Sequence, residues 1–337
     1  MRGRVQQGVP PRNLRKFVKI RKYVILVDFL MYLGIEGGGT TWVVVLASNS
    51  TTFEKREDFS TTDNPKETLE AIRKWFEPYL SDIKGIGVAT FGPIDANPLS
   101  STYGYITATP KPGWKNTDVL GLLKLRNKED CNNIPVNFDT DVNAPALAEY
   151  EFLTSRGGND DITSCAYVTV GTGVGVGLVV NKESVKGLMH PEAGHLRFPR
   201  LDANDNFEGI CPFHGSCVEG LVGTRALCAR FGVSAEALKD LPDDLDHWNY
   251  VAYQLANLCF SLILIASPQK ISIGGGVMNR KCLYPLIRKH TFDLLNGYIL
   301  NDNVTKDGLE SYISPSEFGS TAGITGAVYL AIIAASK

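Results

Sequence analysis

The sequence has no apolar run long enough to span a bilayer, so no membrane span is predicted. It also has no excess of charge, because 34 Lys and Arg residues stand against 36 Asp and Glu residues, and the net charge of -2 gives no electrostatic reason to expect nucleic acid as a partner. Its 7 cysteines are odd in number and scattered, which excludes a disulfide framework, indicates a reducing compartment and predicts a cytoplasmic protein. The length of 337 residues favours two domains that share a cleft.

The amino-terminal segment has no acidic residue before Asp28, although it is rich in Lys and Arg. The rest of the chain, residues 31–337, holds 26 basic and 35 acidic residues. The first 30 residues contain no serine and no small-residue cleavage site, so neither a transit peptide nor a secretory signal is predicted. We interpret residues 1–30 as a basic, flexible extension that the fold does not need, with Met31 as a candidate functional start.

Two common nucleotide-binding signatures are missing. No G-x-x-x-x-G-K-[ST] motif occurs, and the glycine run that begins at Gly171 lacks the last glycine of G-x-G-x-x-G and continues as strand-like sequence. The chain has instead two glycine turns between β-rich runs, at residues 37–40 and 171–175. Glycines let backbone amides approach a phosphate closely, so two such turns facing each other could hold a triphosphate. Each turn alone is equally well read as a tight turn without a ligand.

The remaining pattern alternates strands and helices. Strands are predicted at 83–91, 134–139, 166–180 and 270–273, and helices at 65–80, 143–153, 218–230, 247–266, 280–295 and 321–335. We expect Asp63 or Asn64 to cap the first of these helices and Asn279 to cap the helix at 280–295. The long loop at 95–114, rich in glycine, proline and threonine, is expected to border a substrate. The restart of strands near residue 166 marks the predicted domain boundary.

Asp141 lies between a predicted strand and a predicted helix. The free amides and the dipole of a helix start stabilise a carboxylate in its charged form, so we expect Asp141 to accept a proton at neutral pH. The alternative interpretation is a helix cap. Asp139 is a nearby rival for a base.

Three candidate metal ligands, Cys211, His214 and Cys217, lie three residues apart in a loop that contains proline and glycine. These ligand types suit tetrahedral zinc with one further donor, for which His190 is one candidate. The alternative is a chance meeting of Cys and His in a loop. The remaining cysteines are expected to be buried as small hydrophobic residues.

Three segments together resemble, in order, the two phosphate motifs and the adenosine motif of the ROK family of sugar kinases. They are Leu33-Gly34-Ile35-Glu36-Gly37-Gly38-Gly39-Thr40, Thr169-Val170-Gly171-Thr172-Gly173-Val174-Gly175 and Ile273-Gly274-Gly275-Gly276-Val277-Met278. Within that family the sequence is most similar to zinc-dependent bacterial-type fructokinases, through a Gly-Tyr-Ile-Thr run at 104–107 and a Thr-Pro-Lys-Pro-Gly-Trp run at 109–114. Thr41 departs from the pattern, since many relatives have lysine there.

The resemblance implies an α/β, actin-like (ribonuclease H-like) two-domain sugar kinase fold with a cleft between the domains. The implied domains are residues 31–158 and 159–318, the second carrying the zinc loop, and residues 319–337 would form a helix that packs back on the first domain. The implied activity is transfer of a phosphoryl group from ATP to the 6-hydroxyl of fructose, with Mg²⁺ bound to the ATP and a structural Zn²⁺. A homodimer is also suggested.

The resemblance further implies the site residues. Asp141 would be the catalytic base, and Glu36 would hold magnesium through water. The zinc ligands would be His195, Cys211, His214 and Cys217; the sugar would be bound by Asn143, Glu192, His195 and Glu219; and ATP would be bound by Gly37, Gly38, Gly39, Thr40, Gly171, Thr172, Gly173, Gly274, Gly275, Gly276 and Met278. Lys111 would approach either the phosphates or the sugar.

Two alternatives accompany this hypothesis. The substrate could be glucose, mannose or N-acetylmannosamine, because specificity among hexoses rests on a few hydroxyl contacts. The chain could instead be a sugar-responsive ROK regulator without catalysis. Such regulators need a helix-turn-helix ahead of the kinase-like part, and residues 1–30, with Pro10 and Pro11, are too few and too irregular for one.

Overall fold

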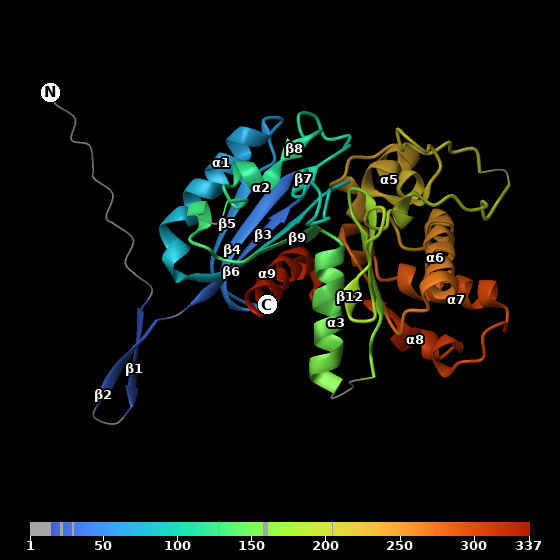
Figure 1. The fold of residues 1–337 in the computed structure, drawn as a ribbon. Helices are drawn as coiled ribbons and strands as arrows, with labels where there is room; N and C mark the ends of the chain where they lie inside the picture. The colour runs from blue at the N-terminus through green and yellow to red at the C-terminus, as the bar shows by residue number, and fades with distance from the viewer. Residues whose placement is uncertain (1–14, 21–22, 29, 128, 158–160, 204) are drawn as a thin grey trace.

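The computed structural model describes residues 15–20, 23–28, 30–127, 129–157, 161–203 and 205–337 (Figure 1). The strands are β1 (Arg15–Ile20), β2 (Tyr23–Asp28), β3 (Met31–Gly37), β4 (Thr41–Asn49), β5 (Thr52–Ser60), β6 (Ile83–Thr90), β7 (Tyr105–Ile106), β8 (Thr117–Asp118), β9 (Val136–Thr140), β10 (Cys165–Val170), β11 (Val174–Val180), β12 (Glu183–Ser184), β13 (Ile271–Gly274) and β14 (Ile313–Pro315). The helices are α1 (Pro65–Phe76), α2 (Val119–Leu122), α3 (Asn143–Gly157), α4 (Val218–Val222), α5 (Thr224–Phe231), α6 (His247–Ala266), α7 (Leu283–Leu295), α8 (Gly308–Tyr312) and α9 (Ala322–Ala335).

Two five-stranded sheets organise the described residues. The first sheet has the order β5-β4-β3-β6-β9, and the second has the order β12-β11-β10-β13-β14. In the first sheet, β3 pairs with β4 in antiparallel register and with β6 in parallel register. In the second sheet, β10 pairs in the same way with β11 and with β13. Because parallel strands end at the same sheet edge, the loops that follow β3, β6 and β9 gather at one edge, and those that follow β10, β13 and β14 gather at another.

The carboxyl-terminal helix α9 returns to the first sheet and lies with α3 between the two halves of the molecule (Figure 1). It is apolar nearly all round, as a helix buried on every side must be. Three glycines of the first sheet make room for it. A Cβ atom at Gly85 or Gly87 would lie 2.3 or 2.0 Å from a carbonyl oxygen of α9, and one at Gly34 would lie 2.6 Å from Val328.

The second half has its own core, which α6 and α7 cover. Among the described residues, α6 is the one helix long and apolar enough to cross a bilayer. Its apolar residues are mostly buried in this core, where Trp248, Leu255 and Leu258 have exposed fractions of 1% or less. Core packing therefore accounts for the composition of α6.

Several element predictions are confirmed and two are wrong. Asn64 caps α1, since its side chain accepts a hydrogen bond from the Glu67 amide. The helix predicted at 218–230 is divided into α4 and α5 at Gly223, where a Cβ atom would lie 2.8 Å from the carbonyl oxygen of Thr172. Asn279 does not cap the helix predicted at 280–295, because it ends a short 3₁₀ turn and α7 begins at Leu283 without a side-chain cap.

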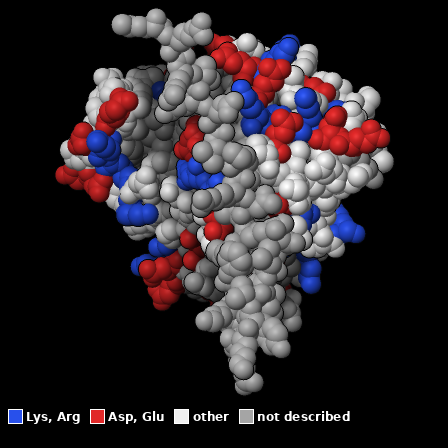
Figure 2. All heavy atoms as spheres, turned by 90° about the vertical axis from the view of Figure 1, so that its left-hand side faces the viewer, with Lys and Arg blue, Asp and Glu red and all other residues white. Residues whose placement is uncertain are grey.

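The predicted extension, residues 1–30, lies partly outside the described residues. Its described strands β1 and β2 pair with each other in antiparallel register and project from the body of the molecule (Figure 1). Figure 2 shows the face on that side. On its described part, acidic and basic side chains are interspersed.

Candidate active site

The edge of the first sheet brings together three segments that are distant in sequence. Glu36 lies on β3 one residue before the first glycine turn, and Asp141 directly follows β9. The end of β6 lies between them, and its Thr90 carbonyl accepts a hydrogen bond from the Asp141 amide at 3.0 Å. This register places both carboxylates beside the first glycine turn.

The first glycine turn is open to solvent. Gly39 and Thr40 are exposed, and a Cβ atom at Gly39 would meet no atom within 4 Å. The backbone holds the turn through the Gly38 amide, which donates to the Thr41 carbonyl at 2.9 Å. Thr61 adds one side-chain contact, from its Oγ1 to the Gly38 carbonyl at 2.7 Å. The open side therefore leaves room for a phosphate to approach the backbone of Gly39 and Thr40.

Asp141 and Glu36 have unusual ionisation. Burial, together with the charge of Glu192, raises the pKa of Asp141 to about 7, although His190 opposes this shift. Burial also raises the pKa of Glu36 to about 7, with Asp141 as the next cause. Burial thus opposes the helix start at Asp141, and a pKa of about 7 leaves this group able to accept a proton at neutral pH.

The second glycine turn joins β10 and β11 and is braced by the chain beyond it. The Gly171 carbonyl accepts hydrogen bonds from the amide and the hydroxyl of Thr224, at 2.8 and 2.9 Å. The Val174 amide donates to Oε2 of Glu219 at 3.1 Å. A Cβ atom at Gly171 would meet nothing within 4 Å, so this turn also has an open side.

The third glycine run lies beside the second turn, because Gly274 pairs with Thr169 in parallel register. Gly275 has φ +94, and a Cβ atom there would lie 2.4 Å from the Val170 carbonyl oxygen, so only glycine fits. Gly276 has open space around it. The Met278 side chain is 1% exposed and belongs to the core, so a contact with adenosine in this conformation would have to come from the backbone around it.

The two edges approach each other at the start of α3. Val142 follows Asp141 directly, and its atoms would lie within 2.5 Å of Cβ atoms placed on Gly175 and Gly177 of β11. The absence of side chains at these two glycines therefore lets the start of α3, and Asp141 with it, lie directly on the second hairpin.

The loop after β12 carries an acid between two histidines. Glu192 lies 2.9 Å from Nε2 of His190 and 3.9 Å from Nε2 of His195. His190 is buried and also faces the loop after β6, since its ring would lie 3.2 Å from a Cβ atom on Gly92. His190 is absent from the metal-ligand cluster, which argues against it as the fourth ligand.

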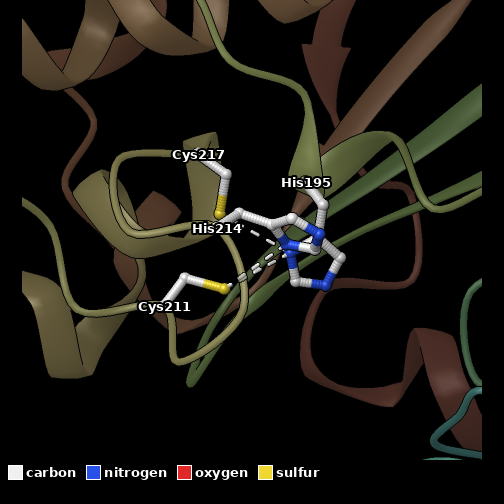
Figure 3. Close-up of side chains that lie close together, drawn as sticks. All are labelled: His195, Cys211, His214 and Cys217. Carbon is white, nitrogen blue, oxygen red and sulfur yellow. Dashed lines mark hydrogen bonds between the residues drawn. The ribbon is translucent and has the colours of Figure 1, made fainter.

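Four Cys and His side chains converge in the loop before α4 (Figure 3). Their ligand atoms all lie within 4.8 Å of one another, and Nδ1 of His195 lies 3.7 Å from Sγ of Cys211 and 3.5 Å from Sγ of Cys217. Nδ1 of His214 lies 3.6 Å from Sγ of Cys211. Tetrahedral zinc has ligand-to-ligand edges of roughly 3.5–3.8 Å between sulfur and nitrogen or sulfur ligands, so these three distances are compatible with a zinc ion among the four side chains.

The remaining candidate site residues are also placed. Asn143 is fully buried at the start of α3, and Asp139 is fully buried at the end of β9. Lys111 lies at the edge of the first half, 3.6 Å from Oδ1 of Asp63. Trp114, from the same loop, is a core residue that stacks on Trp42 with ring centroids 5.4 Å apart.

Comparison with known proteins assigns the chain to a family. A family model described as the ROK family matches residues 32–333. The chain belongs to the ROK family.

The resemblance stated from the sequence is therefore confirmed. This ROK protein is 39% identical over 302 residues to a fructokinase of Pediococcus pentosaceus, covering 89% of this chain and 98% of that protein. It is 35% identical over 315 residues to a fructokinase of Zymomonas mobilis subsp. mobilis, covering 92% and 99%. The solved structure of a ROK hexokinase from Thermus thermophilus superposes with a TM-score of 0.68 at 21% identity, covering 90% of this chain and 98% of that one. The actin-like fold class is thus confirmed.

Buried polar atoms without a partner mark the same region of this ROK protein. Five such side-chain atoms occur among the described residues, and three belong to Thr90, Asn143 and His190, which surround Asp141 in sequence or space. A buried polar atom without a hydrogen bond is costly, so such atoms are kept where a ligand or water supplies the bond. Thr90 lies in none of the sequence motifs, because no local pattern distinguishes it from other strand residues.

Proposed function

We propose that this ROK protein transfers the γ-phosphoryl group of ATP to the 6-hydroxyl of fructose. The observation that carries the proposal is the position of Asp141, a carboxylate whose pKa lies at about 7, between the hairpins that carry two open glycine turns. Relatives named fructokinase that are 35 and 39% identical over most of the chain support the choice of sugar.

The two glycine turns would bind the triphosphate from opposite sides. Phosphoryl transfer requires mainly the positioning of the two substrates and the stabilisation of negative charge. The amides around Gly39 and Gly171 can provide both, because no side chain occupies the open space beside them. We place the adenosine near residues 274–276, which lie next to the second turn.

Asp141 would accept the proton of the attacking hydroxyl. A general base works best when its pKa lies near the working pH, because it is then sufficiently ionised and still basic. The pKa of about 7 meets this requirement. Asp139 is the weaker candidate, because its carboxylate is 1% exposed and already accepts hydrogen bonds from Asn143 and Ser184.

Glu36 would hold Mg²⁺ at the phosphates. Neighbouring carboxylates that repel each other form a site that favours a divalent cation, and after burial the charge of Asp141 is the next cause that raises the pKa of Glu36. The cation would supply charge stabilisation to the transferred group. The role of Glu36 would be to orient it beside the first turn.

The four Cys and His residues would hold a structural Zn²⁺. Burial raises the pKa of the Cys217 thiol to about 11, and a bound cation is what would keep this sulfur as a thiolate. Nδ1 of His195 faces the sulfurs, so its Nε2 is directed towards Glu192. The metal would thereby orient His195 as a sugar ligand, together with Glu192, Glu219 and Asn143.

Three further predictions from the sequence concern the location of the protein, its assembly and its domain limits. A cytoplasmic location, a dimer and the domain limits at residues 158 and 318 stay predictions. All cysteines in the described residues are free, in keeping with a reducing compartment.

The deciding experiment measures ADP release from the purified full chain with Mg-ATP and fructose, glucose, mannose or N-acetylmannosamine. We expect turnover to be highest with fructose. Asp141→Asn should lower kcat by about 10²–10⁴-fold without changing the melting temperature much. The matched control is Asp244→Asn, at an exposed loop position, which should keep full activity. Zinc-loaded, folded protein that releases no ADP with any of the four sugars would refute the kinase assignment.

A further inference from the structure

Asp139 is a buried carboxylate with an unusual number of donors. Its Oδ1 accepts hydrogen bonds from the Thr140 amide at 2.8 Å and from Nδ2 of Asn143 at 3.0 Å. Its Oδ2 accepts one from the hydroxyl of Ser184 at 3.0 Å and lies 2.9 Å from Nζ of Lys186. A buried charge needs such partners, because its transfer from water is otherwise very costly.

These donors come from both halves of the molecule. Asp139 belongs to β9 of the first sheet and lies two residues before Asp141. Ser184 ends β12 of the second sheet, and Lys186 lies two residues further along. The ion pair therefore links the two halves directly beside the proposed base.

The ion pair also decides which way the Asn143 amide points. An ionised carboxylate can only accept hydrogen bonds, so the nitrogen of the amide must face Asp139. Its oxygen must then point away from Asp139. That oxygen is buried and has no hydrogen-bond partner in the described structure. A donor is missing at this point, and a sugar hydroxyl is a donor of the right kind.

We propose that Lys186 is a positioning residue, which compensates the charge of Asp139 so that Asp139 holds the Asn143 amide with its oxygen free to accept a hydroxyl of the bound sugar. This inference rests on the proposed function, because it assigns to Asn143 a contact with the hexose. The hydroxyl would reach Asn143 as the two halves separate and close around the substrates. The sequence offers no signal for this role, since Lys186 lies in no motif.

The test compares Lys186→Met with Lys186→Arg in the full-length, zinc-loaded protein. The lost hydrogen bond between the amide and the sugar is worth about 1.4 kcal/mol, which is tenfold in binding, so Lys186→Met should raise the KM for fructose about tenfold. The kcat should fall less than about threefold and the KM for ATP should stay within about twofold, because neither depends on this amide. Lys186→Arg keeps the charge and should restore the KM for fructose to within about threefold of wild type. Lys182→Met, in the same hairpin and exposed, is the matched control and should behave as wild type.

Lys186→Met leaves a buried carboxylate without its cation, which can impair folding. A second variant therefore tests the same role in a protein that is expected to stay folded. Lys186→Gln keeps a hydrogen-bond donor and should stay folded, as checked by its melting temperature, while it raises the KM for fructose several-fold, roughly half-way to Lys186→Met on a logarithmic scale. An unchanged KM for fructose in the folded variants would overturn the inference, and so would an equal rise in both KM values, which would indicate a merely structural pair. Wild-type protein without hexose kinase activity would be a different result, because it would remove the proposed function itself.

Discussion

The two glycine turns are alike in sequence but are held in different ways. The first is fixed by its own backbone and by the hydroxyl of Thr61. The second is fixed by Thr224 and by the carboxylate of Glu219, which lies two residues after Cys217. The first turn is therefore a property of its own sheet. The second depends on the loop whose Cys and His residues converge, so a metal in that loop would act on both nucleotide and sugar.

The largest effect should come from removing one ligand of the Cys and His cluster. Cys211→Ser should lose bound zinc and lower kcat/KM for fructose by about 100-fold, because the loop would no longer orient His195 and Glu219. Zinc content, measured by metal analysis of the purified protein, should fall from about one ion per chain. Cys228→Ser, a partly exposed position in α5, is the control. A zinc-free Cys211→Ser protein with full activity would show that the second turn does not depend on the loop.

Glu219 allows the comparison to be sharpened, because it touches the second turn and is also a proposed sugar ligand. Glu219→Gln keeps an acceptor for the Val174 amide but removes the charge. We expect the KM for fructose to rise about tenfold, since a charged acceptor binds hydroxyls more strongly than a neutral one. The KM for ATP should stay the same or fall, because one negative charge beside the phosphates is lost. A rise in the KM for ATP alone would instead assign Glu219 to bracing the turn.

The carboxylates of the first half make activity depend on pH. The reaction requires ionised Asp141, and the pKa of this group in the free enzyme is about 7. Protonation below this value removes the base, so kcat/KM should rise with pH, by about tenfold between pH 6 and pH 8. The measurement is a pH profile of kcat/KM at saturating Mg²⁺, with Asp141→Asn as the flat reference. A profile without a midpoint between pH 6 and pH 8 would contradict the role of Asp141.

Much of the fold could be predicted from the sequence, because the decisive signals are local. Asn64 caps α1 as expected, and the first glycine turn follows from two apolar strands around consecutive glycines. The division of the predicted helix at Gly223 could not be foreseen, since it depends on the carbonyl of Thr172, about 50 residues earlier in the chain.

The candidate site likewise has features that the local sequence predicts and features that depend on the packed molecule. Three of the four metal ligands lie within seven residues, and their spacing alone suggested a metal. The ionisation of Asp141 could not be read from its position before a helix, because burial is a property of the packed molecule. The contact between Lys186 and Asp139 joins two sheets and leaves no trace in either local sequence.

The smallest effect on substrate binding is expected at the first turn, where the substitution removes a single hydroxyl. Thr61→Val removes the hydrogen bond to the Gly38 carbonyl but keeps the shape of the side chain. The backbone hydrogen bond of Gly38 remains, so the KM for ATP should rise only about twofold to threefold, and the KM for fructose should not change. Thr51→Val, in the exposed turn at the other end of β4 from the first glycine turn, is the control. Thr61→Val could instead weaken ATP binding as strongly as Cys211→Ser does. The first turn would then depend on a side-chain contact as much as the second turn does.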